Sequence, residues 1–135
     1  MEDCIFCKIA KSVLPSYKIY EDDFTFAFLD INPVNPGHSL VIPKEHFKDF
    51  IETPQDIAHK LVSTVQKIVP AILRAVGADS FNIGINNGSN AGQIVFHTHV
   101  HIMPRFSEDG RNLWAGNTPQ AEDLEKIAEE IIKNM

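Results

Sequence analysis

The sequence has little of several features that define whole classes of protein. Its 135 residues include two cysteines, too few for the disulfide framework of a small secreted domain. No apolar stretch approaches the roughly 20 residues that a membrane-spanning helix needs. Residues 1–4 contain no basic region and no apolar run, so we expect no signal peptide, no membrane contact and a cytoplasmic protein.

Positive charge is also scarce. Lys and Arg number 12 against 18 Asp and Glu, and the formal net charge is -6. Binding to a nucleic acid polymer depends on neutralising many phosphates, so we expect none here. A single nucleotide held in a local pocket remains compatible with this charge.

What the sequence does contain is the composition of an ordinary globular domain. Hydrophobic residues make up 44% and charged residues 22%, which is close to the average for soluble domains. The length suffices for one core, and no repeat, low-complexity tract or long linker divides it. We therefore predict one domain over residues 1–135.

Apolar periodicity and turn signals predict strands, a helix, further strands and a second helix. The strands are expected over residues 17–21, 24–29, 39–42, 80–86 and 94–103. Thr53-Pro54 should begin the first helix, and Pro70 should kink or end it near Val69. Thr118-Pro119 should begin the second helix, whose apolar stripe is Leu124, Ile127, Ala128, Ile131 and Ile132. Short turns favour antiparallel pairing, so the predicted fold is an α+β domain with a mainly antiparallel sheet.

The predicted strand over residues 94–103 carries three alternating histidines. Alternate strand residues face opposite sides, so His97, His99 and His101 should share one face. The opposite face should join the core through Ile94, Phe96, Thr98, Val100 and Ile102. A neutral imidazole can attack phosphorus and form a covalent phosphohistidine. A second, protonated histidine can stabilise phosphate charge or protonate the leaving group.

Two other interpretations of the histidine strand stay open. A histidine-rich face could simply contact water. Three histidines at alternate strand positions could also ligate one metal ion. The loop over residues 86–93 precedes this strand, and its small and polar residues would let backbone N–H groups approach an anion. An ordinary turn is the alternative for that loop.

Residues 92–103 resemble the signature of the histidine triad (HIT) family of nucleotide hydrolases and transferases. The likeness extends to residues 4–8, 28–31 and 37–46 and to Asn86, where Hint-like members have related motifs, and it weakens beyond Pro104. The resemblance implies a HIT-like fold, hydrolysis at the α-phosphate of a purine nucleotide, and a homodimer.

The resemblance also implies roles for individual residues. His99 would be the nucleophile, the carbonyl of His97 would hold its protonated nitrogen, His101 would contact the phosphate and leaving group, and His38 would complete the network. Gln93 would lie near the scissile bond, and Asp30 would bind the ribose hydroxyls. Asn86 and the backbone of Gly92 would contact the phosphate side. Ile5, Phe6, Phe28 and Ile31 would line a slot for the purine.

One position departs from the Hint-like pattern. Ile94 stands where these members often have a serine whose hydroxyl helps to hold the phosphate. Two functions stay open as alternatives to the nucleotide hydrolase that the resemblance implies. One is a diadenosine polyphosphate hydrolase of the same family, and the other is a nucleotide-binding or interaction module with weak chemistry. Trp114 would extend toward the active site of a partner subunit.

Cys4 and Cys7 have the spacing of half a zinc site. A closed site needs four ligands, so histidines must supply the rest, with His46, His59 and His97 as candidates. The resemblance to zinc-containing bacterial and archaeal members points to His46 and His97, and to a structural zinc that the chemistry does not require. A redox pair and two free thiols are the alternatives for Cys4 and Cys7.

Overall fold

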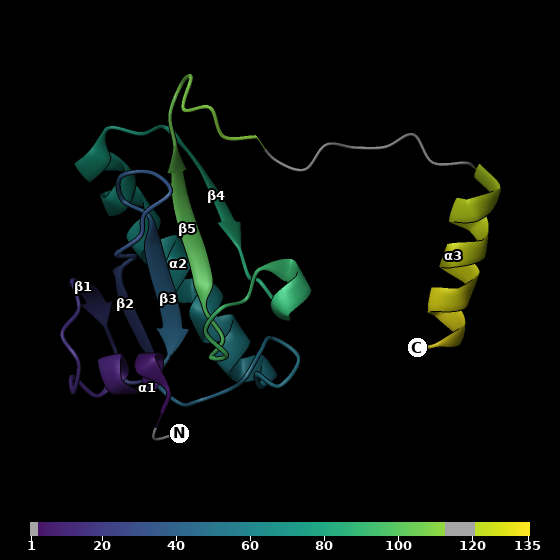
Figure 1. The fold of residues 1–135 in the computed structure, drawn as a ribbon, viewed down its shortest axis with the longest axis horizontal. Coiled ribbons are helices and arrows are strands. Elements are labelled where there is room, and N and C mark those ends of the chain that lie inside the picture. Colours follow the sequence, from purple (N-terminus) through teal and green to yellow (C-terminus); the bar gives the residue numbers. More distant parts are fainter. Residues whose placement is uncertain (1–2, 113–120) are drawn as a thin grey trace.

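The computed structural model describes residues 3–112 and 121–135, and its centre is an open five-stranded sheet (Figure 1). The strands are β1 (Lys18–Glu21), β2 (Thr25–Leu29), β3 (Ser39–Pro43), β4 (Ser80–Gly84) and β5 (Val100–Arg105). Their order is β1-β2-β3-β5-β4, with antiparallel pairing throughout. The predicted α+β class and five-stranded antiparallel sheet are confirmed.

Helix α2 (Gln55–Val76) covers one face of this sheet. Leu61 and Val65 from the helix belong to the same buried cluster as Val41 of β3 and Val100 and Ile102 of β5. Each fully buried aliphatic side chain contributes about 1.5–3 kcal/mol through removal from water. This layer therefore fixes the position of β5, the strand that follows His97 and His99 in the chain.

Of the two effects predicted for Pro70, a kink or an end near Val69, the end is wrong. The helix continues to Val76 and ends at Gly77, whose φ of 73° suits a glycine. Pro70 lies on the exposed side of the helix, while Ile72 beyond it is only 8% exposed and joins the core. Burial of the apolar face past the proline holds the last turns in place despite the missing backbone donor.

The short helix α1 (Ile5–Ala10) covers the opposite face of the sheet. Phe6 and Ile9 pack there in a second buried cluster with Phe26, Phe28, Leu40 and Ile42. In the sheet register, Leu40 is paired with both Phe28 and His101. Cross-strand partners point to the same side, so His101 projects on the face that α1 covers.

The strand predicted over residues 94–103 is shorter and later than expected, because β5 begins at Val100. Thr98, Val100 and Ile102 are buried as predicted, but Ile94 is 88% exposed and Phe96 39% exposed, so their assignment to the core is wrong. The backbone N–H of Thr98 donates to the carbonyl of Phe47 at 2.8 Å. That bond ties the segment before β5 to the loop after β3, so the backbone N–H of Thr98 does not pair with a neighbouring strand of the sheet.

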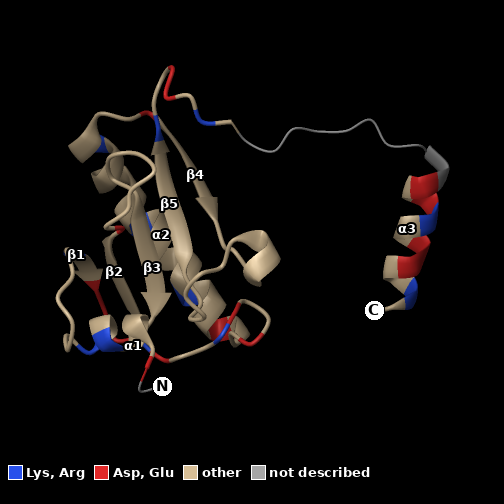
Figure 2. Ribbon diagram, in the orientation of Figure 1, with Lys and Arg blue, Asp and Glu red and all other residues tan. Residues whose placement is uncertain are grey.

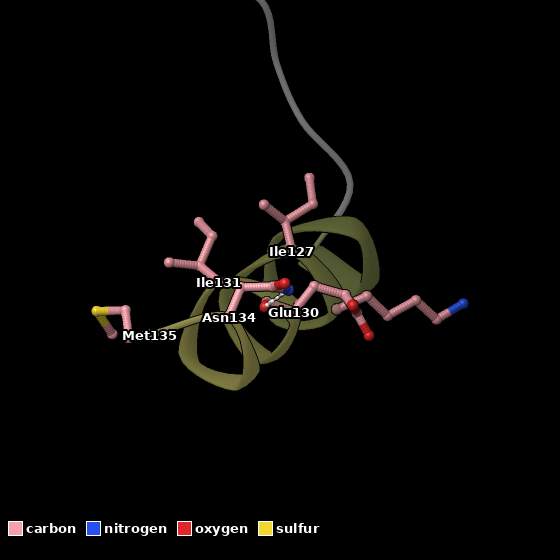
Figure 3. Close-up of a pocket in the computed structure, with 6 residues that line it drawn as sticks. Ile127, Glu130, Ile131, Asn134 and Met135 are labelled. Atoms are coloured by element: carbon pink, nitrogen blue, oxygen red, sulfur yellow. Dashed lines mark hydrogen bonds between the residues drawn. The ribbon is translucent and has the colours of Figure 1, made fainter. Parts of the chain in front are cut away.

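Helix α3 (Ala121–Lys133) lies apart from the sheet in Figure 1. Its predicted start at Thr118-Pro119, and Trp114, lie outside the described residues. Figure 2 shows acidic and basic residues alternating along the helix. The predicted apolar stripe is exposed, with Leu124, Ile127 and Ile131 each more than half accessible. A shallow pocket of about 510 Å³ lies over this side of the helix, beside Ile127, Ile131 and Met135 (Figure 3).

Within the described residues, no helix combines the length and apolar character needed to cross a bilayer.

Candidate active site and metal cluster

The ring of His99 is held in one orientation by the backbone of its own segment. Its Nδ1 lies 2.7 Å from the carbonyl oxygen of His97. A carbonyl oxygen can only accept, so Nδ1 carries the proton and Nε2 keeps its lone pair. Phe6 packs edge-on against this ring, with centroids 5.1 Å apart. The arrangement presents a neutral imidazole with a basic nitrogen, which is the form that a phosphorus nucleophile needs.

His101 and His38 form a chain of donors beside His99. The rings of His99 and His101 lie 4.9 Å apart between centroids. The N–H of Val34 donates to Nδ1 of His38 at 3.0 Å, so Nε2 of His38 carries its proton. That Nε2 lies 2.9 Å from Nδ1 of His101. His101 therefore accepts at Nδ1 and keeps its own proton at Nε2.

Burial lowers the pKa of all three of these histidines. The pKa of His101 falls to about 4, through burial first and then through its neighbours His99 and His38. Burial likewise lowers the pKa of His99 and of His38, although the carboxylate of Asp30 opposes the shift in both. The three rings are consequently neutral at pH 7, and hydrogen bonds set which of their nitrogens donate and which accept.

The low pKa of His101 predicts that the fold is lost more easily in acid. Its pKa is about 4 in the folded protein and about 6.5 when exposed. Between these values the unfolded chain binds more protons, so the free energy of unfolding falls as the pH drops from about 6.5 to 4 and levels off below. Urea unfolding at several pH values should show a shallower slope for His101→Asn than for the original protein. Equal slopes would contradict the assignment.

Asp30 follows β2 and lies at the edge of this histidine group. Its Oδ2 is 3.6 Å from Nε2 of His38, and its Oδ1 accepts the N–H of Asn32 at 2.8 Å. The side chain is 19% exposed, so the carboxylate remains accessible to a ligand. A partly exposed carboxylate beside a neutral histidine group can accept hydrogen bonds from a pair of hydroxyls.

The four residues expected to line a purine slot have two different environments. Phe6 and Phe28 are buried in the α1 cluster, with ring centroids 5.5 Å apart. Ile5 and Ile31 are exposed, at 51% and 77%. The two isoleucines are therefore the members of this set that are free to contact a ligand.

The loop before the histidines is held by the side chain of Gln93. Its Oε1 accepts the N–H of Gly88, and its Nε2 donates to the carbonyls of Lys48 and Val95. Gln93 is only 5% exposed. Its amide therefore braces the loop through the backbone of Lys48, Gly88 and Val95, and its place near the scissile bond stays a prediction.

Asn86 and Gly92 meet across the same loop. Gly92 has a φ of 90°, and a Cβ built on it would lie 3.7 Å from Nδ2 of Asn86. The N–H of Gly92 donates to the carbonyl of Ser89 at 3.0 Å. Gly92 and the amide of Asn86 therefore lie side by side, while the N–H of Gly92 is taken up within the loop, and their contact with the phosphate side stays a prediction.

A second group of side chains joins the N-terminus to the histidine segment. Cys4, Cys7, His46 and His97 place their ligand atoms within 4.8 Å of one another. Nδ1 of His97 lies 3.4 Å from Sγ of Cys4 and 3.2 Å from Nδ1 of His46. His59, the other candidate, is exposed on α2 and takes no part in the cluster.

This cluster fits a tetrahedral zinc ion. Sγ of Cys7 lies 3.4 Å from Nδ1 of His46 and 3.5 Å from Nδ1 of His97. Ligand atoms at ordinary Zn–N and Zn–S distances are about 3.3–3.8 Å apart in a tetrahedron. Nε2 of His97 donates to the carbonyl of Pro43 at 2.8 Å. That bond leaves Nδ1 unprotonated and aimed at the cluster, as a ligand must be.

Sequence reasoning missed two groups that set the state of these rings. The carbonyl of Pro43 orients His97, and the N–H of Val34 orients His38. Both are backbone groups, and a backbone group leaves no signature in residue type. In the sequence, Pro33, Pro36 and Gly37 indicate a tight turn before His38.

Fold and site together define an α+β protein whose histidine run, beside a Cys2His2 cluster, leads into an inner strand of an antiparallel sheet. The chain belongs to the histidine triad family, because the family model described as HIT domain matches residues 11–108. The resemblance found in the sequence is confirmed.

Two curated relatives align over nearly the whole chain. Adenylylsulfatase HINT3 of Arabidopsis thaliana is 45% identical over 132 residues, which are 96% of this chain and 66% of the plant protein. Adenosine 5'-monophosphoramidase hnt1 of Schizosaccharomyces pombe is 38% identical over 130 residues, which are 95% of each protein.

Two solved structures share the fold. A HIT family protein from Bacillus subtilis superimposes with a TM-score of 0.90 at 41% identity, over 98% of this chain and 97% of that one. A zinc-bound histidine triad family protein from Mycobacterium smegmatis gives a TM-score of 0.77 at 34% identity, over 99% of both chains.

Proposed function

We propose that this protein is a nucleotide hydrolase that cleaves the bond between the α-phosphorus of a purine nucleoside 5'-monophosphate and its leaving group, with a preference for phosphoramidates. The observation that carries the proposal is the bond from Nδ1 of His99 to the carbonyl of His97, which leaves Nε2 as a nucleophile. The names of relatives that act on adenylylsulfate and adenosine phosphoramidate support the same class of reaction.

The proposed reaction has two displacements. Nε2 of His99 forms a bond to phosphorus while the bond from phosphorus to the leaving nitrogen breaks, which leaves a positive charge on the His99 ring. Nε2–H of His101 protonates the leaving nitrogen, and the resulting His101 imidazolate is stabilised by the N–H of His38 and by the positive charge on His99. Water then attacks the nucleotidyl-histidine, its proton passes to His101, and the His99–phosphorus bond breaks. The products are an amine and a nucleoside monophosphate, and both histidines return to their starting states.

In this proposal the surrounding residues bind the rest of the nucleotide. Asp30 accepts from the ribose hydroxyls, and Ile5 and Ile31 contact the purine above Phe6 and Phe28. Asn86 and the backbone of Gly92 contact the phosphate side. Gln93 contributes by bracing the loop that carries them, as its three backbone contacts suggest.

Comparison of two substrates tests the proposal directly. We expect adenosine 5'-phosphoramidate to be turned over with a higher kcat/KM than diadenosine polyphosphates. Preference for the dinucleotides would assign the chain to the other hydrolytic activity. Binding of AMP without turnover of either substrate would leave a nucleotide-binding module with weak chemistry.

The role of Asp30 gives a second prediction. Asp30→Asn should raise KM for adenosine phosphoramidate by roughly tenfold or more, since charge-assisted hydrogen bonds contribute about 1.5–3 kcal/mol. It should also remove the preference for a ribose substrate over its 2',3'-dideoxy analogue. The matched control is Asp23→Asn at an exposed position of the β1–β2 turn. A ribose preference that survives in Asp30→Asn would assign hydroxyl recognition to another group.

We also propose a structural zinc ion held by Cys4, Cys7, His46 and His97. A zinc ion with four protein ligands has no open position for substrate, and it would cross-link α1 with the loops that follow β3 and precede β5. The single domain over residues 1–135, the homodimer and the cytoplasmic location remain predictions of this proposal.

A further inference from the structure

We propose that Asp109 is a positioning residue that sets the protonation pattern of the histidine chain without touching the substrate. Its carboxylate would hold the turn over residues 33–37 so that Val34 presents its N–H to His38. The inference rests on the proposed function, because it concerns how His101 comes to carry the proton for the leaving group.

The carboxylate of Asp109 accepts an unusually complete set of hydrogen bonds. Oδ2 accepts from Nδ2 of Asn35, Nε of Arg105 and the N–H of Phe106, at 3.0, 2.8 and 3.1 Å. Oδ1 accepts from Nη2 of Arg105 and the N–H of Arg111, both at 2.9 Å. Arg105 and the backbone donors hold the pKa of Asp109 well below its usual range. The side chain is 8% exposed, so this ionised group is shielded from water.

Two of these partners reach the turn that precedes His38. Nδ2 of Asn35 also donates to the carbonyl of Pro104 at 2.9 Å, which ties the turn to β5. The backbone N–H of Arg111 donates to Asp109, and this bond positions the residue. Its Nη2 then donates to the carbonyl of Val34 at 3.0 Å. The carbonyl of Asn35 accepts the N–H of His38 at 3.1 Å. Val34 is thus held by its carbonyl on one side while its N–H donates to His38 on the other.

The consequence for the chemistry follows from the tautomers. While Val34 donates to Nδ1 of His38, that ring must carry its proton at Nε2 and donate to His101. If the turn relaxes, His38 can hold its proton at Nδ1 and accept from His101 instead. The proton of His101 would then sit at Nδ1, and its Nε2 would have none to give to the leaving group.

A leaving group that needs no proton separates this role from a merely structural one. We expect Asp109→Asn to lower kcat for adenosine phosphoramidate by about tenfold or more, with KM changed by less than about twofold. Turnover of the nitrophenyl ester of AMP should change by less than about threefold, because its leaving group departs unprotonated. Glu108→Gln, at an exposed neighbouring position, is the charge-matched control and should leave both rates unchanged.

Two further measurements keep the proposal testable if Asp109→Asn folds poorly. Arg111→Met removes the contact with Val34 from an exposed residue and should produce the same substrate-dependent loss. Imidazole ¹⁵N spectra should show the proton of His38 at Nε2 in the original protein and at both nitrogens in the variants. Equal losses on both substrates, or an unchanged His38 spectrum, would overturn the inference. Failure of the original protein on both substrates would overturn the proposed function instead.

Discussion

The variant His99→Gly is expected to lose turnover of adenosine phosphoramidate by at least about 10³-fold, because removal of a nucleophile leaves only the binding and electrostatic groups. AMP binding should change little, since the groups proposed to hold the ribose and the purine belong to other segments. Rapid-quench mass spectrometry should find one AMP group attached to the original protein during turnover and none attached to the variant.

The control for this experiment is His59→Gln, which changes an exposed histidine on α2. It should keep full activity and the covalent adduct. Turnover of His99→Gly at the original rate, or an AMP group attached to a different residue, would show that the nucleophile has been assigned incorrectly.

The second large effect is expected from loss of the proposed zinc ion. Cys7 is 4% exposed, and its Sγ lies within 3.5 Å of two histidine nitrogens. Cys7→Ser should reduce bound zinc from one equivalent to below about a tenth. A ligand whose dissociation constant is a thousandfold below its free concentration stabilises the folded state by about 4 kcal/mol. We therefore expect the free energy of unfolding of Cys7→Ser to be lower by an amount of that order.

Urea unfolding with and without a chelator measures this effect. The chelator should destabilise the original protein and His59→Ala, which keeps all four ligands, but should not change Cys7→Ser. The metal content and thiol reactivity should also be measured on protein purified without added zinc. The absence of metal, together with reaction of both thiols with a thiol reagent, would contradict the zinc proposal. Activity should fall as well, because His97 is a proposed zinc ligand and also supplies the carbonyl that orients His99.

The sheet could be predicted from the sequence because its signals are local. Turn residues between short apolar segments locate β1, β2 and β3 to within a residue or two, and helical spacing locates α2. The end of α2 could not be predicted, because burial of Ile72 on the sheet outweighs the local effect of Pro70. The predicted burial of Ile94 and Phe96 was wrong for a similar reason. Alternation assumes a strand, and the bond from Thr98 to Phe47 keeps the residues before Val100 out of the strand.

The candidate site divides in the same way. Side chains with distinctive chemistry, such as His99, Cys4 and Cys7, stand out in the sequence. The partners that fix their protonation do not, since Val34, Pro43 and His97 act through backbone atoms. Gln93 illustrates the difference: the resemblance implies a place near the scissile bond, while its bracing contacts with the backbone of Gly88 and Lys48 appear only in the structure.

The sequence alone determined the residue types available for chemistry, the order of the strands and the two long helices, and the family, because these depend on local patterns and on a motif of alternating histidines. It did not predict the short helix α1, whose Phe6 and Ile9 are buried against the sheet. The tertiary structure decided which nitrogen of each ring holds its proton and which two histidines join the cysteines in one cluster. It also brought Asp109 to a turn more than seventy residues earlier in the chain. Such contacts join segments distant in the chain through backbone groups common to every residue, and no local pattern encodes them.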